Sequence, residues 1–84
     1  MAYNVKDWGF IEPGATIFVG YAWSDGGSRG AQYAQGMPED ADSVLSVNDH
    51  TIGYGRDSRF WYGFQMKNGG PNGTRFGLDG GGLS

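Results

Sequence analysis

The stretch that decides the fold is Arg59-Phe60-Trp61-Tyr62-Gly63-Phe64-Gln65-Met66-Lys67. Its apolar side chains recur at every second position from Phe60 to Met66, which is the period of a pleated strand with one face on a core. The same alternation runs through Ala15-Thr16-Ile17-Phe18-Val19-Gly20-Tyr21-Ala22-Trp23. Both stretches are rich in aromatic and β-branched residues, which pack well on a pleated surface. They predict strands at Ala15–Trp23 and Arg59–Lys67.

Weaker alternation predicts further short strands, at Tyr3–Ile11, Gly30–Gly36, Ser43–Val47, Thr51–Tyr54 and Thr74–Leu78. Asn48-Asp49-His50 is predicted as a hairpin turn, and the stretch Pro38–Val44 as one helical turn, because Pro and acidic residues suit a helix start. The total is about seven short strands with a turn signal roughly every 8–12 residues. This pattern predicts a single all-β domain over residues 1–84, built as an antiparallel sandwich or a small barrel.

Composition excludes several classes of protein. The chain has 17 Gly but only 3 Pro, and 15 % of its residues are aromatic, which fits neither collagen nor a disordered linker. There is no Cys and a single His, so neither disulfides nor a structural zinc site of the usual kind is expected. Small domains bury only about 60–65 % of their unfolded surface. Aromatic packing and self-association are therefore the expected sources of stability.

The charge pattern restricts the partners and the location. The formal net charge is −3, and the six Lys and Arg residues do not cluster, so no nucleic-acid partner is expected. No apolar run is long enough to cross a membrane, and the N-terminus lacks a signal-peptide pattern. We therefore expect a soluble protein without membrane insertion, whose compartment the sequence leaves open.

Catalytic and metal-binding patterns are weak in this chain. His50 is the only candidate base for a nucleophilic triad, and it is interpreted as an exposed turn residue. Glu39, Asp40 and Asp42 lie close in sequence, but without the spacing of a calcium loop, and are interpreted as solvated charges. A non-catalytic protein without cofactor or metal is therefore expected.

Aromatic residues beside Asp or Gly point to sugar recognition. A sugar ring is held by an aromatic surface together with planar polar groups such as carboxylates and amides. Trp23 with Asp25, and Tyr54 with Asp57, have this combination. They are the candidate residues of a small lectin. The competing interpretation is that many of these aromatic side chains simply form the core, since Leu, Ile and Val are few.

Two strands are apolar on both faces. The alternation places Phe18 and Trp61 on the faces opposite to the core, where a solitary antiparallel sheet should be polar. Gly20 and Gly63 lie in the same strands, where a missing side chain permits close approach of a partner. These four residues predict a self-associating surface, and hence a homo-oligomeric interaction module. Glycan binding is the alternative use of such a surface.

A family resemblance appears in residues 61–78. Trp61-Tyr62-Gly63-Phe64-Gln65-Met66-Lys67 alternates, Asn68-Gly69-Gly70-Pro71-Asn72-Gly73 breaks the pattern, and Thr74-Arg75-Phe76-Gly77-Leu78 alternates again. This arrangement resembles the strand–turn–strand core of bacterial immunoglobulin-like repeat domains of adhesion and cell-surface proteins. The resemblance implies an immunoglobulin-like β-sandwich with an interaction or spacer role and no catalysis, and it assigns no functional residues.

Overall fold

The computed structural model describes residues 2–82. Within them the chain forms strands and no helix: β1 (Ala2–Ile11), β2 (Thr16–Tyr21), β3 (Gln32–Pro38), β4 (Leu45–Tyr54), β5 (Phe60–Asn68) and β6 (Thr74–Gly82). The strands make two antiparallel three-stranded sheets, with the orders β1-β6-β3 and β2-β5-β4. The all-β, antiparallel prediction is confirmed.

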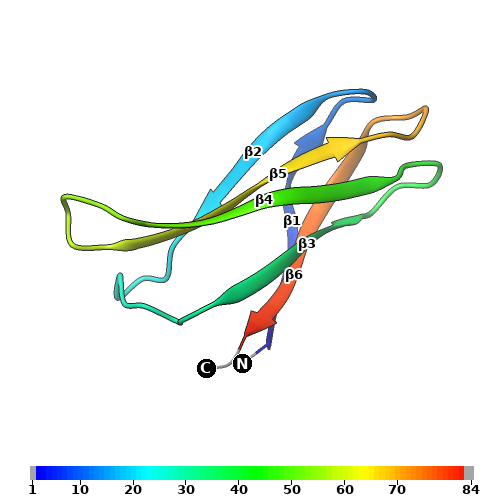
Figure 1. Ribbon diagram of the computed structural model, residues 1–84. Coiled ribbons are helices and arrows are strands. Elements are labelled where there is room, and N and C mark those ends of the chain that lie inside the picture. The colour runs from blue at the N-terminus through cyan, green and yellow to red at the C-terminus, as the bar shows by residue number, and fades with distance from the viewer. Residues whose placement is uncertain (1, 83–84) are drawn as a thin grey trace.

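The strand pairs are nested, because β1 pairs with β6 and β2 pairs with β5. Only the β4–β5 hairpin joins consecutive strands of one sheet. The β1–β2, β3–β4 and β5–β6 connections lie together at one end, whereas the β4–β5 hairpin and the β2–β3 loop project at the other (Figure 1). A constant-type immunoglobulin domain places its first two strands in one sheet, and here β1 and β2 lie in different sheets.

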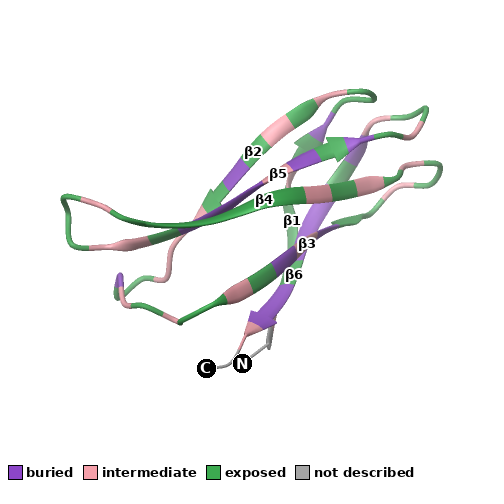
Figure 2. Cartoon of the chain, viewed as in Figure 1, coloured by how far each residue is buried: buried purple, intermediate pink, exposed green. Residues whose placement is uncertain are grey.

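One hydrophobic core joins the two sheets, and it is formed by Ile11, Val19, Ala34, Phe64, Met66, Phe76 and Leu78. The central strands β5 and β6 carry most of the buried positions, while β4 is exposed along much of its length (Figure 2). In β5 the buried residues include Tyr62, Phe64 and Met66, as the alternation predicts. The prediction that β5 turns this face towards the core is therefore confirmed.

The predicted hairpin turn at Asn48-Asp49-His50 is wrong, because these residues lie within the continuous strand β4. The register of β4 on β5 shifts between Asn48 and Thr51, and Asp49 has a φ of 55°. This irregularity is a β-bulge, in which an extra residue is accommodated on one strand. Asn and Asp tolerate left-handed backbone in turns and bulges alike. Two predicted strands therefore merge, and the described residues contain six strands.

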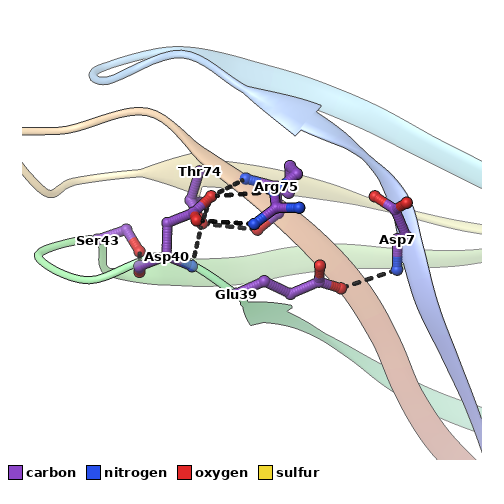
Figure 3. Close-up of polar contacts among 6 residues, drawn as sticks. All are labelled: Asp7, Glu39, Asp40, Ser43, Thr74 and Arg75. Carbon is purple, nitrogen blue, oxygen red and sulfur yellow. Dashed lines mark hydrogen bonds and ion pairs between the residues drawn. The ribbon is translucent and has the colours of Figure 1, made fainter.

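The predicted helical turn at Pro38–Val44 is also wrong. Pro38 ends β3, and residues 39–44 form a loop with bends at residues 40–42. Polar contacts hold this loop on β6 (Figure 3): Asp40 accepts hydrogen bonds from Arg75 N–H (2.9 Å) and from the Arg75 guanidinium (3.1 Å), and Asp40 N–H donates to Thr74 Oγ1 (3.0 Å). The same stretch places the Glu39 carboxylate 2.8 Å from Asp7 N–H on β1. Asp40 therefore bonds this loop to β6, although its side chain stays 39 % exposed.

Asp40→Asn should remove a pH-dependent part of the stability. Hydrogen bonds from Arg75 hold the pKa of Asp40 below its ordinary value. A carboxyl whose pKa is lowered on folding stabilises above its unfolded pKa of about 3.9, and this contribution is lost as the pH falls towards the folded pKa. The melting temperature of the wild type should exceed that of Asp40→Asn at neutral pH, and the gap should close below about pH 4. Thermal melts by circular dichroism across this range measure the gap.

The matched control is Asp42→Asn in the same loop, which should leave the pH dependence of the wild type intact. A gap between wild type and Asp40→Asn that stays constant from neutral to acidic pH would contradict the assigned role of Asp40.

Candidate functional site

The outer face of the β2-β5-β4 sheet carries the residues predicted for self-association. In the register of β2 on β5, Gly20 pairs with Gly63 and Phe18 pairs with Gln65, so Phe18, Gly20, Trp61 and Gly63 share one side of the sheet. Phe18 is 59 % exposed and Trp61 is 45 % exposed. We call these four residues the aromatic face. The structure thus brings together residues from two strands that lie far apart in the sequence.

The two glycines of the aromatic face are covered by a side chain of the same molecule. A Cβ atom built at Gly63 would overlap the Phe18 ring, and one built at Gly20 would lie 3.0 Å from Phe18 Cε2. The absence of side chains at both positions therefore lets the Phe18 ring lie against the backbone of the sheet. The space predicted for a partner at Gly20 and Gly63 is taken up by Phe18. The exposed side of that ring, with the Trp61 indole, is what the face presents to solvent.

Trp23 and Asp25, two of the residues predicted for glycan binding, are engaged in contacts within the chain. The Trp23 ring meets those of Tyr3, Tyr21 and Tyr62 at centroid distances of 5.5, 5.7 and 5.2 Å. Asp25 accepts from Gly27 N–H (2.9 Å) and pairs with the Arg29 guanidinium (3.1 Å). These bonds lower the pKa of Asp25.

Tyr54 and Asp57, the other two predicted glycan residues, lie at the β4–β5 hairpin. Tyr54 is 65 % exposed and packs on Phe60, with ring centroids 4.6 Å apart. Asp57 accepts from Arg59 N–H (3.1 Å), and the Arg59 guanidinium lies 3.4 Å from the Trp23 carbonyl oxygen. The hairpin thus lies against the β2–β3 loop through Arg59. Trp23 also lines a pocket, together with Tyr3, Val5 and Trp8.

Two partly buried tyrosines in the cluster around Trp23 are joined by a hydrogen bond. The hydroxyls of Tyr3 on β1 and Tyr21 on β2 lie 2.7 Å apart, so they join the two sheets by a hydrogen bond. Desolvation raises the pKa of both phenols. Both groups therefore stay neutral at physiological pH, and the bond joins two neutral hydroxyls. Tyr62 adds a further link, because its hydroxyl accepts from Arg29 N–H at 2.7 Å.

A pocket that the sequence did not indicate lies between the sheets. It has a volume of about 140 Å³, and Gln32, His50, Thr51 and Tyr62 are among its lining residues. His50 is part of β4 rather than of a turn, and its Nε2 lies 3.0 Å from the Ala34 carbonyl oxygen on β3. These residues come from three strands and match no local motif, so only the pairing of strands reveals them.

Comparison with protein-family models, curated proteins and solved structures gave no match. Within residues 2–82 there is no helix long and apolar enough to cross a membrane. The same residues contain no group of three or more His, Cys, Asp or Glu side chains arranged to hold a metal ion.

Proposed function

We propose that this protein is a non-catalytic interaction module that self-associates through the aromatic face. The observation that carries the proposal is the exposure of Phe18 (59 %) and Trp61 (45 %) on the outer side of the β2-β5-β4 sheet. An antiparallel sheet that faces water normally has polar residues on that side. A second copy of the chain supplies a matching apolar surface, because a two-fold interface uses the same patch on both subunits.

The size of the face sets the expected strength of association. Six residues of β2 span roughly 20 Å, and three strands at the usual spacing span roughly 14 Å. The product of these two lengths, the approximate area of the sheet face, is smaller than the roughly 800 Å² that each partner buries in a standard interface. The oligomer is therefore expected to be in equilibrium with the monomer, with the micromolar to millimolar affinity of a transient complex.

The fold supports a scaffold role for this surface. Two antiparallel sheets around one core are compatible with a β-sandwich, and the resemblance of residues 61–78 to bacterial immunoglobulin-like repeats adds the expectation of a spacer or interaction role. Because β1 and β2 lie in different sheets, the proposal rests on the aromatic face and not on that resemblance. Glycan binding through Trp23, Asp25, Tyr54 and Asp57 is the weaker alternative, since Trp23, Asp25 and Asp57 are engaged in contacts within the chain.

Trp61→Ser should convert the protein to a monomer without unfolding it. The substitution removes the largest exposed apolar side chain of the aromatic face and leaves the core unchanged. Sedimentation velocity from about 10 µM to about 1 mM, a range that covers transient affinities, measures the association. Circular dichroism shows whether the variant remains folded.

The matched control is Tyr33→Ser, because Tyr33 is 63 % exposed and lies on β3 of the other sheet. It should associate like the wild type. A wild type that stays monomeric at the highest concentration would overturn the proposal. Loss of folding in Trp61→Ser would show that Trp61 is a structural residue rather than a contact residue.

A further inference from the structure

The residues that line the pocket between the sheets include the last residue of β2, Tyr21, and the first residue of β3, Gln32. These strand ends lie towards the side of the fold from which the β4–β5 hairpin and the β2–β3 loop project (Figure 1). The pocket's volume of about 140 Å³ is close to that of a cavity of about 150 Å³ known to accept benzene. It therefore has room for about one six-membered ring. The pocket is open to solvent, so a ligand can enter from one side and remain attached to a longer molecule.

Two tyrosines, Tyr21 and Tyr62, are among the residues that line the pocket. Tyr21 and Tyr62 stack with their centroids 6.0 Å apart and their planes at 20°. Their hydroxyls are already bonded, since Tyr21 pairs with Tyr3, while Tyr62 accepts from Arg29 N–H and donates to the Gly30 carbonyl oxygen at 3.1 Å. These bonds hold the rings in place. What the tyrosines offer to a ligand is therefore apolar ring surface.

The polar side of the pocket is rich in acceptors. Gln32 donates from Nε2 to the Arg29 carbonyl oxygen at 2.6 Å, which orients its amide. The other end of that amide, Oε1, is buried and has no hydrogen-bond partner in the described part of the chain. A buried polar atom without a partner costs stability, and a ligand donor would remove that cost.

His50 provides a second acceptor. Its Nε2 lies 3.0 Å from the Ala34 carbonyl oxygen, and a carbonyl oxygen can only accept, so Nε2 carries the proton. In the neutral imidazole, Nδ1 is then an acceptor. Thr51 adds a hydroxyl among the lining residues. The pocket therefore combines aromatic residues with the acceptors of Gln32 and His50 and with a hydroxyl that can donate or accept.

The charges of the lining residues indicate whether a cationic, an anionic or a neutral hydrogen-bond donor fits the pocket. The residues described around this pocket include no Asp, Glu, Lys or Arg. A buried cation without a carboxylate would lack a counter-charge, and an anion would meet acceptors instead of donors. A neutral molecule with several hydroxyls and an apolar C–H face fits both the tyrosine rings and the acceptors.

We propose that this pocket binds one neutral polyhydroxylated ring, either a free monosaccharide or the terminal unit of a glycan, through its lining residues Gln32, Tyr21 and Tyr62. The site differs from the four lectin residues indicated by the sequence. The site shares Gly63 with the aromatic face, but Gln32 and His50, whose side chains are tested below, lie outside that face. Failure of one proposal therefore leaves the other intact.

The experiment is a titration followed by ¹H–¹⁵N NMR, including the side-chain amide of Gln32. The probes are methyl glycosides of glucose, galactose, mannose and N-acetylglucosamine, with their oligosaccharides. Tetrahydropyran serves as a ring without hydroxyls, and methylammonium as a cation. At least one glycoside should shift the resonances of Gln32, His50 and Thr51 with a millimolar Kd, as expected for one small ring. Tighter binding of the matching oligosaccharide would identify a glycan end as the ligand, and equal binding would identify the free sugar.

Gln32→Leu should weaken glycoside binding by about 10-fold, because it removes a polar amide while keeping a side chain of nearly the same size. Gln35→Leu is the matched control, since Gln35 bonds to the Leu45 carbonyl oxygen outside the pocket. It should bind the glycoside like the wild type. Thr51→Val provides a second test if Gln32→Leu does not fold, with a reduction in affinity again expected. The proposal is overturned if no glycoside shifts these resonances, if tetrahydropyran binds equally well, or if only methylammonium binds.

Discussion

Phe64→Ala should lower the free energy of unfolding by about 3–5 kcal/mol, the range measured for large-to-small changes in cores. Phe64 is completely buried at the centre of β5, where it packs with the core residues of both sheets. It also supports the pocket, because its ring lies 5.5 Å from that of His50. A domain of this length is expected to have a stability of roughly 4–12 kcal/mol. The loss is therefore a large fraction of the total, and urea unfolding followed by fluorescence measures it.

Phe18→Ala is the matched control for Phe64→Ala, since it makes the same chemical change at a residue that is 59 % exposed. It should cost about 1 kcal/mol or less in dilute solution, where association does not contribute. Equal losses for the two variants would mean that the core does not lie where the alternation of β5 places it.

Asn68→Ala should cost about 2–4 kcal/mol, because it removes one buried and two partly buried hydrogen bonds. Asn68 is fully buried at the end of β5. Its side-chain amide donates to the carbonyl oxygen of Asn72 at 2.8 Å and to that of Ile11 at 3.4 Å, and its Oδ1 accepts from Gly70 N–H at 3.0 Å. The amide therefore joins the end of β1 to the β5–β6 connection.

The comparison for Asn68→Ala is Asn4→Ala, at an exposed position of β1, which should change the stability by less than about 0.5 kcal/mol. Urea unfolding of both variants gives the two values. If Asn68→Ala costs as little as Asn4→Ala, water can replace the Asn68 amide as the hydrogen-bond donor to the carbonyl oxygens of Ile11 and Asn72. The amide would then not be a structural link.

The sequence indicates most strands because their signal is local. The alternation of residues 59–67 predicts both the strand β5 and the face that Phe64 and Met66 turn inward, and it places Trp61 on the opposite face. The period of two follows from the pleat of a single strand and needs no partner. The same reasoning fails at Asn48-Asp49-His50, because a left-handed residue such as Asp49 fits a turn and a bulge equally well.

The glycines likewise include positions that the sequence explains and positions that only the structure explains. The excess of Gly indicates a fold with many turns, and Gly14 and Gly26 have the positive φ expected there. For glycines inside strands the sequence does not indicate what covers them. Gly63 lies beneath Phe18, whereas Gly36 lies against Met66, where a Cβ would overlap the sulfur atom. Neither neighbour is near in the sequence.

The sequence by itself therefore determines the all-β class, the faces of the longest strands and the apolar character of Phe18 and Trp61, because steric preference and alternation act within a few residues. The tertiary structure alone determines that β1 pairs with β6, that Asp40 binds Arg75 and that Gln32 and His50 line one pocket. These contacts depend on how two sheets close around a shared core. They bring together residues from distant parts of the chain, which no local pattern specifies.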